Sequence, residues 1–294
     1  MMTEVQFRQR LHDCQDLASL RCNLLALERV FNNQHTHVEE FAKIIARDPS
    51  LTTRMLRMVN SAYFGLSAKI NTIEGAVLYL GLGNVRLLMS TTPVIEDLEV
   101  MAQDGTQVPW REFWLHALGC AFATREILNQ FDLGVDNDTD HISGLLQNVG
   151  NIVMAKAFPA ELAQLVQTSY EDEAQFLAAE RALLGWDHAA IGAFYLETHN
   201  IPKEVVEAVG FHHDPCNAPN HKQLVAATHL ADVMVRMAGL RSGTEKRPVL
   251  TERQLMEIPA IGLLRPKKGP ILNGKMRKIT ERISKIPDLC RVML

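Results

Sequence analysis

Apolar residues recur along most of this chain at the three- and four-residue spacing of an amphipathic helix. One apolar stripe runs through Val38–Ala46 and another through Leu51–Asn60. The intervening Asp48-Pro49-Ser50 is typical of a helix start, because proline fits the first turn and a serine hydroxyl can accept a hydrogen bond from a free backbone N–H. No stretch shows the sustained alternation of a β-strand. We therefore predict an all-α, multi-helix fold.

The same spacing predicts four more helices, at Ile73–Gly81, Asn84–Ser90, Phe113–Phe131 and His141–Phe158. The last two are apolar on nearly every face, which is typical of helices buried inside a bundle. Asp187 is expected to cap a further helix that begins with His188. The polar segment Arg241–Pro248 shows no helical period, and we expect it to be loose.

A break in the pattern at Asp97–Pro109 divides the chain. We expect an N-terminal helical subdomain over residues 1–100, a second helical bundle over 101–240 and a polar, basic helical extension over 241–294. The extension carries Lys275, Arg277 and Lys278 close together. A solvated surface helix explains these charges; the alternative is a surface that contacts a nucleotide or an acidic partner.

The composition is that of an ordinary globular protein and narrows the choice of partners. Of 294 residues, 47% are hydrophobic and 22% charged, and the formal net charge is −4, which gives no general attraction to nucleic acid or an anionic membrane. The apolar runs are too short to cross a bilayer, and the polar N-terminus does not read as a signal peptide. Five dispersed cysteines without a Cys-x-x-Cys pair indicate reduced thiols. We expect a cytoplasmic protein without membrane or direct nucleic-acid partners.

Polar residues that can bind metals interrupt the apolar helices in a recognisable order. In chain order they are His116, the pair Gln147-Asn148, His188, the pair His212-His213 and Asp232. This order resembles the HD superfamily of metal-dependent phosphohydrolases, in which the first polar pair is a metal-binding His-Asp. Cys120 lies one turn after His116 and is expected to be a small buried hydrophobic residue, with a place beside the pocket as the alternative.

The first third of the chain narrows the resemblance. Val59–Gly65 reads Val-Asn-Ser-Ala-Tyr-Phe-Gly, and it is followed by Ile73–Gly83 and later by Phe113–His116. These segments are similar to the HDOD family, the HD-related output domains of bacterial signalling, and the likeness covers about residues 15–238. It implies an HD-like bundle for residues 101–240.

The resemblance implies a reduced metal site made of His116, His188, His212, His213 and Asp232. Gln147 and Asn148 offer neutral amides where the superfamily has an imidazole and a carboxylate, and amides are poor ligands for transition metals. Asn151 stands where related cyclic-dinucleotide hydrolases often carry a lysine. Two interpretations stay open: the five residues hold one iron, manganese or zinc ion, or they hydrogen-bond one another as buried polar groups. No cofactor is otherwise required.

Because neighbouring helix residues point in different directions, we expect only one of His212 and His213 to face the site. A second candidate surface consists of the basic residues Arg47, Arg54, Arg57 and Arg86, which could receive a phosphate or an acidic partner. The alternative for these arginines is a solvated helix surface.

We predict from this resemblance a non-catalytic signal-transduction module that acts through protein or ligand binding. The implied partners, acting in trans, are diguanylate cyclases, response regulators or kinases. The rival prediction is an enzyme, a metal-dependent phosphohydrolase that cleaves a nucleotide or cyclic dinucleotide through the reduced site. Loss of the carboxylate that would bridge two ions argues against ordinary phosphodiesterase activity.

Overall fold

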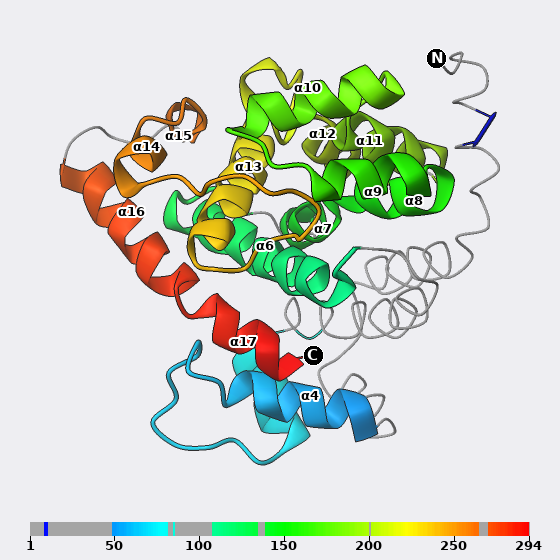
Figure 1. Ribbon diagram of the computed structural model, residues 1–294. Coiled ribbons are helices and arrows are strands. Elements are labelled where there is room, and N and C mark those ends of the chain that lie inside the picture. The colour runs from blue at the N-terminus through cyan, green and yellow to red at the C-terminus, as the bar shows by residue number, and fades with distance from the viewer. Residues whose placement is uncertain are drawn as a thin grey trace.

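The structure is a computed structural model, and it describes residues 9–10, 49–81, 85, 108–134, 139–199, 201–264 and 270–293. Within these ranges the regular elements are helices, and one isolated β-bridge joins Ser169 to Lys246 (Figure 1). The predicted all-α fold is therefore confirmed. The predicted helix Val38–Ala46, and all of Asn84–Ser90 except Val85, lie outside the described residues.

The first long helix in the described part is α4 (Pro49–Val59), and residues 73–81 form a second, as their spacing predicts. The turn between them carries Tyr63, whose ring lies 5.9 Å from the ring of Phe122 on helix α6 (Trp110–Gln130). Tyr63 is almost fully buried. This aromatic contact packs the Val59–Gly65 segment, which carries the family resemblance, against α6 of the bundle.

Helix α6 (Trp110–Gln130) runs through the middle of that bundle (Figure 1). Sixteen of its 21 residues are buried, as expected for a helix that is apolar on nearly every face. Helices α7 (Thr139–Leu146) and α13 (Lys222–Met237) pack along it. The other helices of the bundle are α8 (Val149–Ala157), α9 (Pro159–Gln167), α10 (Glu173–Leu184), α11 (His188–Thr198) and α12 (Lys203–Phe211).

The predicted helix His141–Phe158 is broken in its middle, so that prediction was wrong. Gln147 and Asn148 form a turn between α7 and α8. The two halves pack on different helices, α7 on α6 and α8 on α11, and the break lets the chain change direction between them.

A glycine lies at each close approach between these helices, Gly144 where α7 meets α6 and Gly150 where α8 meets α11. A Cβ atom on Gly144 would lie 2.4 Å from the carbonyl oxygen of Cys120, and one on Gly150 would lie 1.9 Å from that of His188. Both distances are far below van der Waals contact, so only glycine permits these approaches. The Gly-Leu-Leu-Gln-Asn-Val-Gly segment thus packs on α6 at one end and on α11 at the other, and Gln147 lies in the turn between them.

The segment Arg241–Pro248 is not loose, contrary to the prediction. Ser242 and Thr244 are each 2% exposed, and their hydroxyls lie 3.0 Å apart. The backbone N–H of Tyr170 donates to the carbonyl of Lys246 at 2.8 Å. Ser242, Thr244 and Arg247 are buried in this segment because each has a polar partner inside the protein.

The C-terminal extension folds back along the bundle. After the short helices α14 (Glu252–Met256) and α15 (Ala260–Leu263), helices α16 (Pro270–Ile283) and α17 (Ile286–Met293) run down one side of the molecule to α4 (Figure 1). α17 buries Ile286 and Leu289 and contacts both α4 and α6.

Charged residues of α16 reinforce this docking. The Arg282 guanidinium lies 3.3 Å from the Glu126 carboxylate and 5.3 Å from the centre of the Tyr63 ring. Burial, together with the nearby Glu126 carboxylate, raises the pKa of Tyr63 to about 12. Arg277 and Lys278 are exposed, as the surface-helix interpretation expects, whereas the Lys275 ammonium reaches back to the Gln130 carbonyl.

Candidate functional site

Three imidazoles converge at the ends of two helices. His188 is the first residue of α11, and the Asp187 carboxylate caps that helix by accepting the Ala190 N–H at 2.8 Å, as predicted. His212 and His213 follow directly after α12. Both face His188, so the prediction that one would point away was wrong: α12 ends at Phe211, and the helical directions no longer apply.

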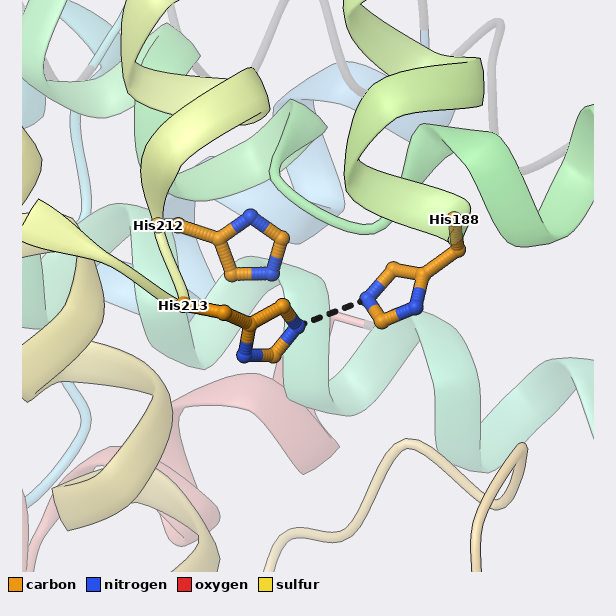
Figure 2. Close-up of side chains that lie close together, drawn as sticks. All are labelled: His188, His212 and His213. Atoms are coloured by element: carbon orange, nitrogen blue, oxygen red, sulfur yellow. Dashed lines mark hydrogen bonds between the residues drawn. The ribbon is translucent and has the colours of Figure 1, made fainter. Parts of the chain in front are cut away.

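The Nε2 atoms of these rings point towards one another (Figure 2). One ligand atom from each ring lies within 4.8 Å of the other two, and Nε2 of His213 is 2.9 Å from Nε2 of His188. The Nε2 atom of His212 is buried without a hydrogen-bond partner. We refer to His188, His212 and His213 as the three-histidine cluster.

A protein oxygen lies within 3.2 Å of each Nδ1 atom of this cluster. These oxygens are Oε2 of Glu180 at 2.8 Å from His188, Oε1 of Glu173 at 3.2 Å from His213, and the carbonyl of Val209 at 2.7 Å from His212. Nδ1 of His213 makes no hydrogen bond, and its Nε2 donates to Nε2 of His188 in this structure. Nδ1 of His188 and Nδ1 of His212 each face an acceptor, so the lone pair of these two rings is on Nε2. This is how proteins orient histidines that bind a metal ion.

The charges around the cluster fit this reading. Burial, reinforced by His213 and His188, holds the pKa of His212 well below its ordinary value, so its Nε2 keeps a free lone pair. Burial also lowers the pKa of His188, but the Glu180 carboxylate outweighs it and the net shift is upward. Burial would raise the pKa of Glu173, and His213 and Arg247 reverse that into a net lowering. The residues present therefore fit a single divalent ion held by three imidazoles.

His116 and Asp232, also predicted as ligands, lie in a different cluster. Nε2 of His116 is 2.9 Å from Oδ1 of Asp232 and 3.4 Å from Sγ of Cys120, and all three residues are buried. Burial would raise the pKa of Asp232, but the hydrogen bond and charge of His116 hold it well below its ordinary value. Burial raises the pKa of the Cys120 thiol. The five predicted ligands thus form two clusters among the described residues, with Cys120 joining the second.

The Gln147 side chain lies against this second cluster. Its Nε2 atom is 3.4 Å from Oδ1 of Asp232 and 3.5 Å from Nε2 of His116. Asn148 is 6% exposed and directly precedes α8, and its side chain makes no capping hydrogen bond to that helix. The Gln147-Asn148 pair therefore occupies the turn beside His116 and Asp232.

Sequence reasoning missed a set of charged residues that surround both clusters. Arg247 lies 2.8 Å from Glu173, 3.6 Å from Asp232 and 2.5 Å from Glu245. The buried Arg236 also pairs with Glu245. Glu173 and Glu180 lie on α10, at distances along the chain that no motif specifies. Only the clustering of opposite charges in residues 241–248 hinted at this network.

A cavity of about 700 Å³ opens beside the three-histidine cluster. His213, His229 and Arg247 line one part of it, and apolar residues such as Val249 and Ile258 line another. A small ligand could therefore approach His213 from solvent.

The predicted arginine surface is only partly described. Arg57 is exposed on α4, and Arg54 lies on the same helix. Arg47 and Arg86 lie outside the described residues.

In the part of the chain that is described, we find no helix with the length and apolar character needed to cross a membrane.

Comparison with known proteins shows the family of the chain. A model of the HDOD domain matches residues 17–215. The chain belongs to the HDOD family. The match spans α4, α6 and the three-histidine cluster, and it confirms the family that the Val59–Gly65 segment predicted.

Solved structures share the HDOD fold. A crystal structure of an HDOD domain protein with unknown function from Geobacter sulfurreducens has a TM-score of 0.70 and 22% sequence identity, covering 90% of this chain and 91% of that one. A Shewanella amazonensis protein described as a "putative phosphohydrolase" has a TM-score of 0.65 and 21% identity, covering 91% of both chains.

A sequence relative is an uncharacterised protein from Treponema pallidum, 27% identical over 237 residues. The match covers 79% of this chain and 45% of that relative, so the chain spans less than half of its length.

Proposed function

We propose that this HDOD protein is a signal-transduction module that acts by binding a protein or ligand and does not hydrolyse phosphoesters. The partners that fit the HDOD resemblance are diguanylate cyclases, response regulators or kinases, bound in trans. The observation that supports the proposal is that His116 and Asp232 are already paired with other groups of the protein.

In that cluster the protein supplies its own partners for the groups that an HD hydrolase directs at metal ions. Asp232 accepts from His116 and Gln147 through Oδ1, and its Oδ2 faces Arg247 at 3.6 Å. Asn148 supplies no carboxylate to bridge this cluster to the three-histidine cluster. Two-ion activation of a water molecule needs such a bridge. The arrangement therefore favours binding over turnover.

The second candidate function is a metal-dependent phosphohydrolase. It is favoured by the unpartnered Nε2 of His212 and by the cavity beside His213. The name of the Shewanella relative points the same way. A divalent ion bound by the cluster would supply Lewis-acid activation of a phosphate or of water. The chain's own contribution would be the three imidazoles, with the Glu180 carboxylate holding the ring of His188 and the Glu173 carboxylate beside His213.

A hydrolysis assay separates the two functions. The purified protein, supplied with Mn²⁺ or Fe²⁺, is incubated with cyclic dinucleotides and with nucleoside mono- and triphosphates, beside His188→Ala and Asp232→Asn. We expect all three proteins to give the same background rate. His221→Ala serves as a matched control, because His221 is exposed and lies outside both clusters. A metal-dependent rate that falls at least tenfold in His188→Ala, and not in His221→Ala, would establish the enzyme instead.

The double substitution Gln147→His with Asn148→Asp tests whether the missing His-Asp pair is what prevents hydrolysis. If the missing pair is what prevents turnover, the double variant should bind additional metal, measured by elemental analysis. Failure to gain metal would show that the turn geometry, rather than the two residue types, keeps the site closed.

A further inference from the structure

The cavity beside the three-histidine cluster has two walls of different chemistry. The start of α10 and the segment that follows α12 supply a polar wall. Residues 248–260 of the C-terminal extension supply a wall that is mostly apolar. At about 700 Å³ the cavity has the size of a small-molecule site, and such sites are typically apolar with a few polar groups. The sequence did not predict this cavity, because segments that lie far apart in the chain build it.

The charged residues that line the cavity are mostly acidic. They are Glu171, Asp172, Glu173 and Asp214, together with a single arginine, Arg247. Glu171, Asp172 and Asp214 are exposed, so their carboxylates are open to solvent at the cavity. A ligand that carries phosphate or carboxylate groups would meet charge of its own sign here, whereas a cation would be attracted.

Arg247 does not reverse this polarity, because its charge is already balanced. Its guanidinium lies 2.8 Å from Glu173 and 3.6 Å from Asp232, and it also pairs with Glu245. The Arg247 side chain is only 6% exposed. A buried guanidinium surrounded by three carboxylates exerts little net attraction on a further anion.

The contact between His213 and Glu173 lacks a hydrogen-bond donor. Nε2 of His213 donates to Nε2 of His188, so Nδ1 carries the lone pair of the neutral ring. This Nδ1 atom is buried without a hydrogen bond, although Oε1 of Glu173 lies 3.2 Å away. Both atoms are then acceptors. Because His213 and Glu173 both line the cavity, a ligand in the cavity can supply the missing donor.

His229 adds another acceptor to the polar wall. Its Nδ1 donates to the carbonyl of His212 at 2.7 Å, which leaves the lone pair of the neutral ring on Nε2. The opposite wall, which includes Val249 and Ile258, offers apolar surface to a hydrocarbon group. Acceptors and carboxylates on one side and apolar side chains on the other suit a ligand with a cationic head and an apolar body.

We propose that this cavity binds a small organic cation, with its ammonium group at Glu173 and His213 and its apolar body against residues 248–260. The proposal rests on the proposed function, since it names the class of ligand for that binding role. It also excludes nucleotides as the occupant of this cavity, because their phosphates carry the wrong charge.

A matched set of probes tests the charge that the cavity selects. The probes 2-phenylethylamine, 2-phenylethanol and 3-phenylpropanoate have bodies of similar shape and carry a positive, no and a negative charge. Ligand-observed NMR titration of the purified full-length protein, with a chelator present, gives their dissociation constants. We expect the amine to bind in about the millimolar range and about tenfold more tightly than the alcohol, with the carboxylate weakest. Equal affinities of the amine and the alcohol, or tightest binding of the carboxylate, would overturn the proposal.

Two changes to the walls test where the amine binds. Glu171→Gln with Asp214→Asn removes two charges from the polar wall and should weaken amine binding about three- to tenfold. Glu197→Gln is the matched control, because Glu197 is exposed on α11 and does not line the cavity. Val249→Lys places a cation on the apolar wall at an exposed position, and it should weaken the amine and strengthen the carboxylate. Unchanged amine affinity in both altered proteins would place the probe elsewhere and refute the assignment.

Failure of this proposal can be told apart from failure of the proposed function. The amine titration contains no phosphoester and no free metal ion, so its result does not depend on turnover. Absence of amine binding would remove this ligand class and leave the hydrolysis assay unaffected. Metal-dependent hydrolysis would refute the non-catalytic role without changing the dissociation constants of the three probes.

Discussion

Replacing Gly150 with alanine tests how tightly α8 and α11 are packed. The new Cβ atom would lie 1.9 Å from the carbonyl oxygen of His188 and 3.0 Å from the backbone nitrogen of Gly192. Because both atoms belong to the backbone, no side chain can rotate away, and the helices must separate by about 1.5 Å to restore van der Waals contact. Overpacking by one methyl group costs about 1–3 kcal/mol, and we expect the upper end here.

The intrinsic helix propensity of alanine offsets about 1 kcal/mol of that cost. The net expectation for Gly150→Ala is a loss of about 2 kcal/mol in the free energy of unfolding. Urea denaturation followed by circular dichroism measures it. Gly274→Ala in α16 is the matched control, because a Cβ atom there meets nothing within 4 Å, and it should stabilise the protein by about 0.5–1 kcal/mol. Equal stability of the two variants would refute the packing argument.

Two further predictions concern charge. Glu180→Gln removes the carboxylate beside Nδ1 of His188, and it should weaken zinc binding by the three-histidine cluster about 10–100-fold in competition titrations. Glu197→Gln, which changes an exposed residue of α11, should leave the zinc affinity unchanged. Equal affinities of the two variants would contradict the orienting role of Glu180. The raised pKa of Tyr63, about 12 against 10.0 for the free side chain, means that its contribution to stability is complete below pH 10 and lost as the pH rises from about 10 to 12. An ultraviolet difference titration against Tyr63→Phe checks this, and a phenolate transition near pH 10 would contradict it.

Local periodicity predicted much of the helical framework. The stripe at Leu51–Asn60, the apolar run from Phe113 and the Asp187 cap correspond to α4, α6 and the start of α11. These features depend on neighbours within one or two turns of the chain, so the sequence carries them directly. The resemblance predicted one site made of His116, His188, His212, His213 and Asp232, whereas the structure divides these residues between two clusters.

Features that depend on contacts between distant segments could not be predicted. Gly144 and Gly150 require a turn between them only because each meets the backbone of a different helix. Cys120 joined the His116 cluster because α13 brings Asp232 to the same face of α6. Arg247 comes from a polar segment without period, and its burial follows from acidic partners that lie far away in the sequence.

The docking of α17 on α4 has a consequence for the order of folding. These two helices are separated by most of the length of the chain, yet they are direct neighbours. Helices α6 and α7 adjoin in sequence and can pair early, whereas α4 gains its contact with α17 only after a very long loop has closed. The N-terminal signature segment therefore reaches its final packing late, once the core of the bundle already exists to receive it.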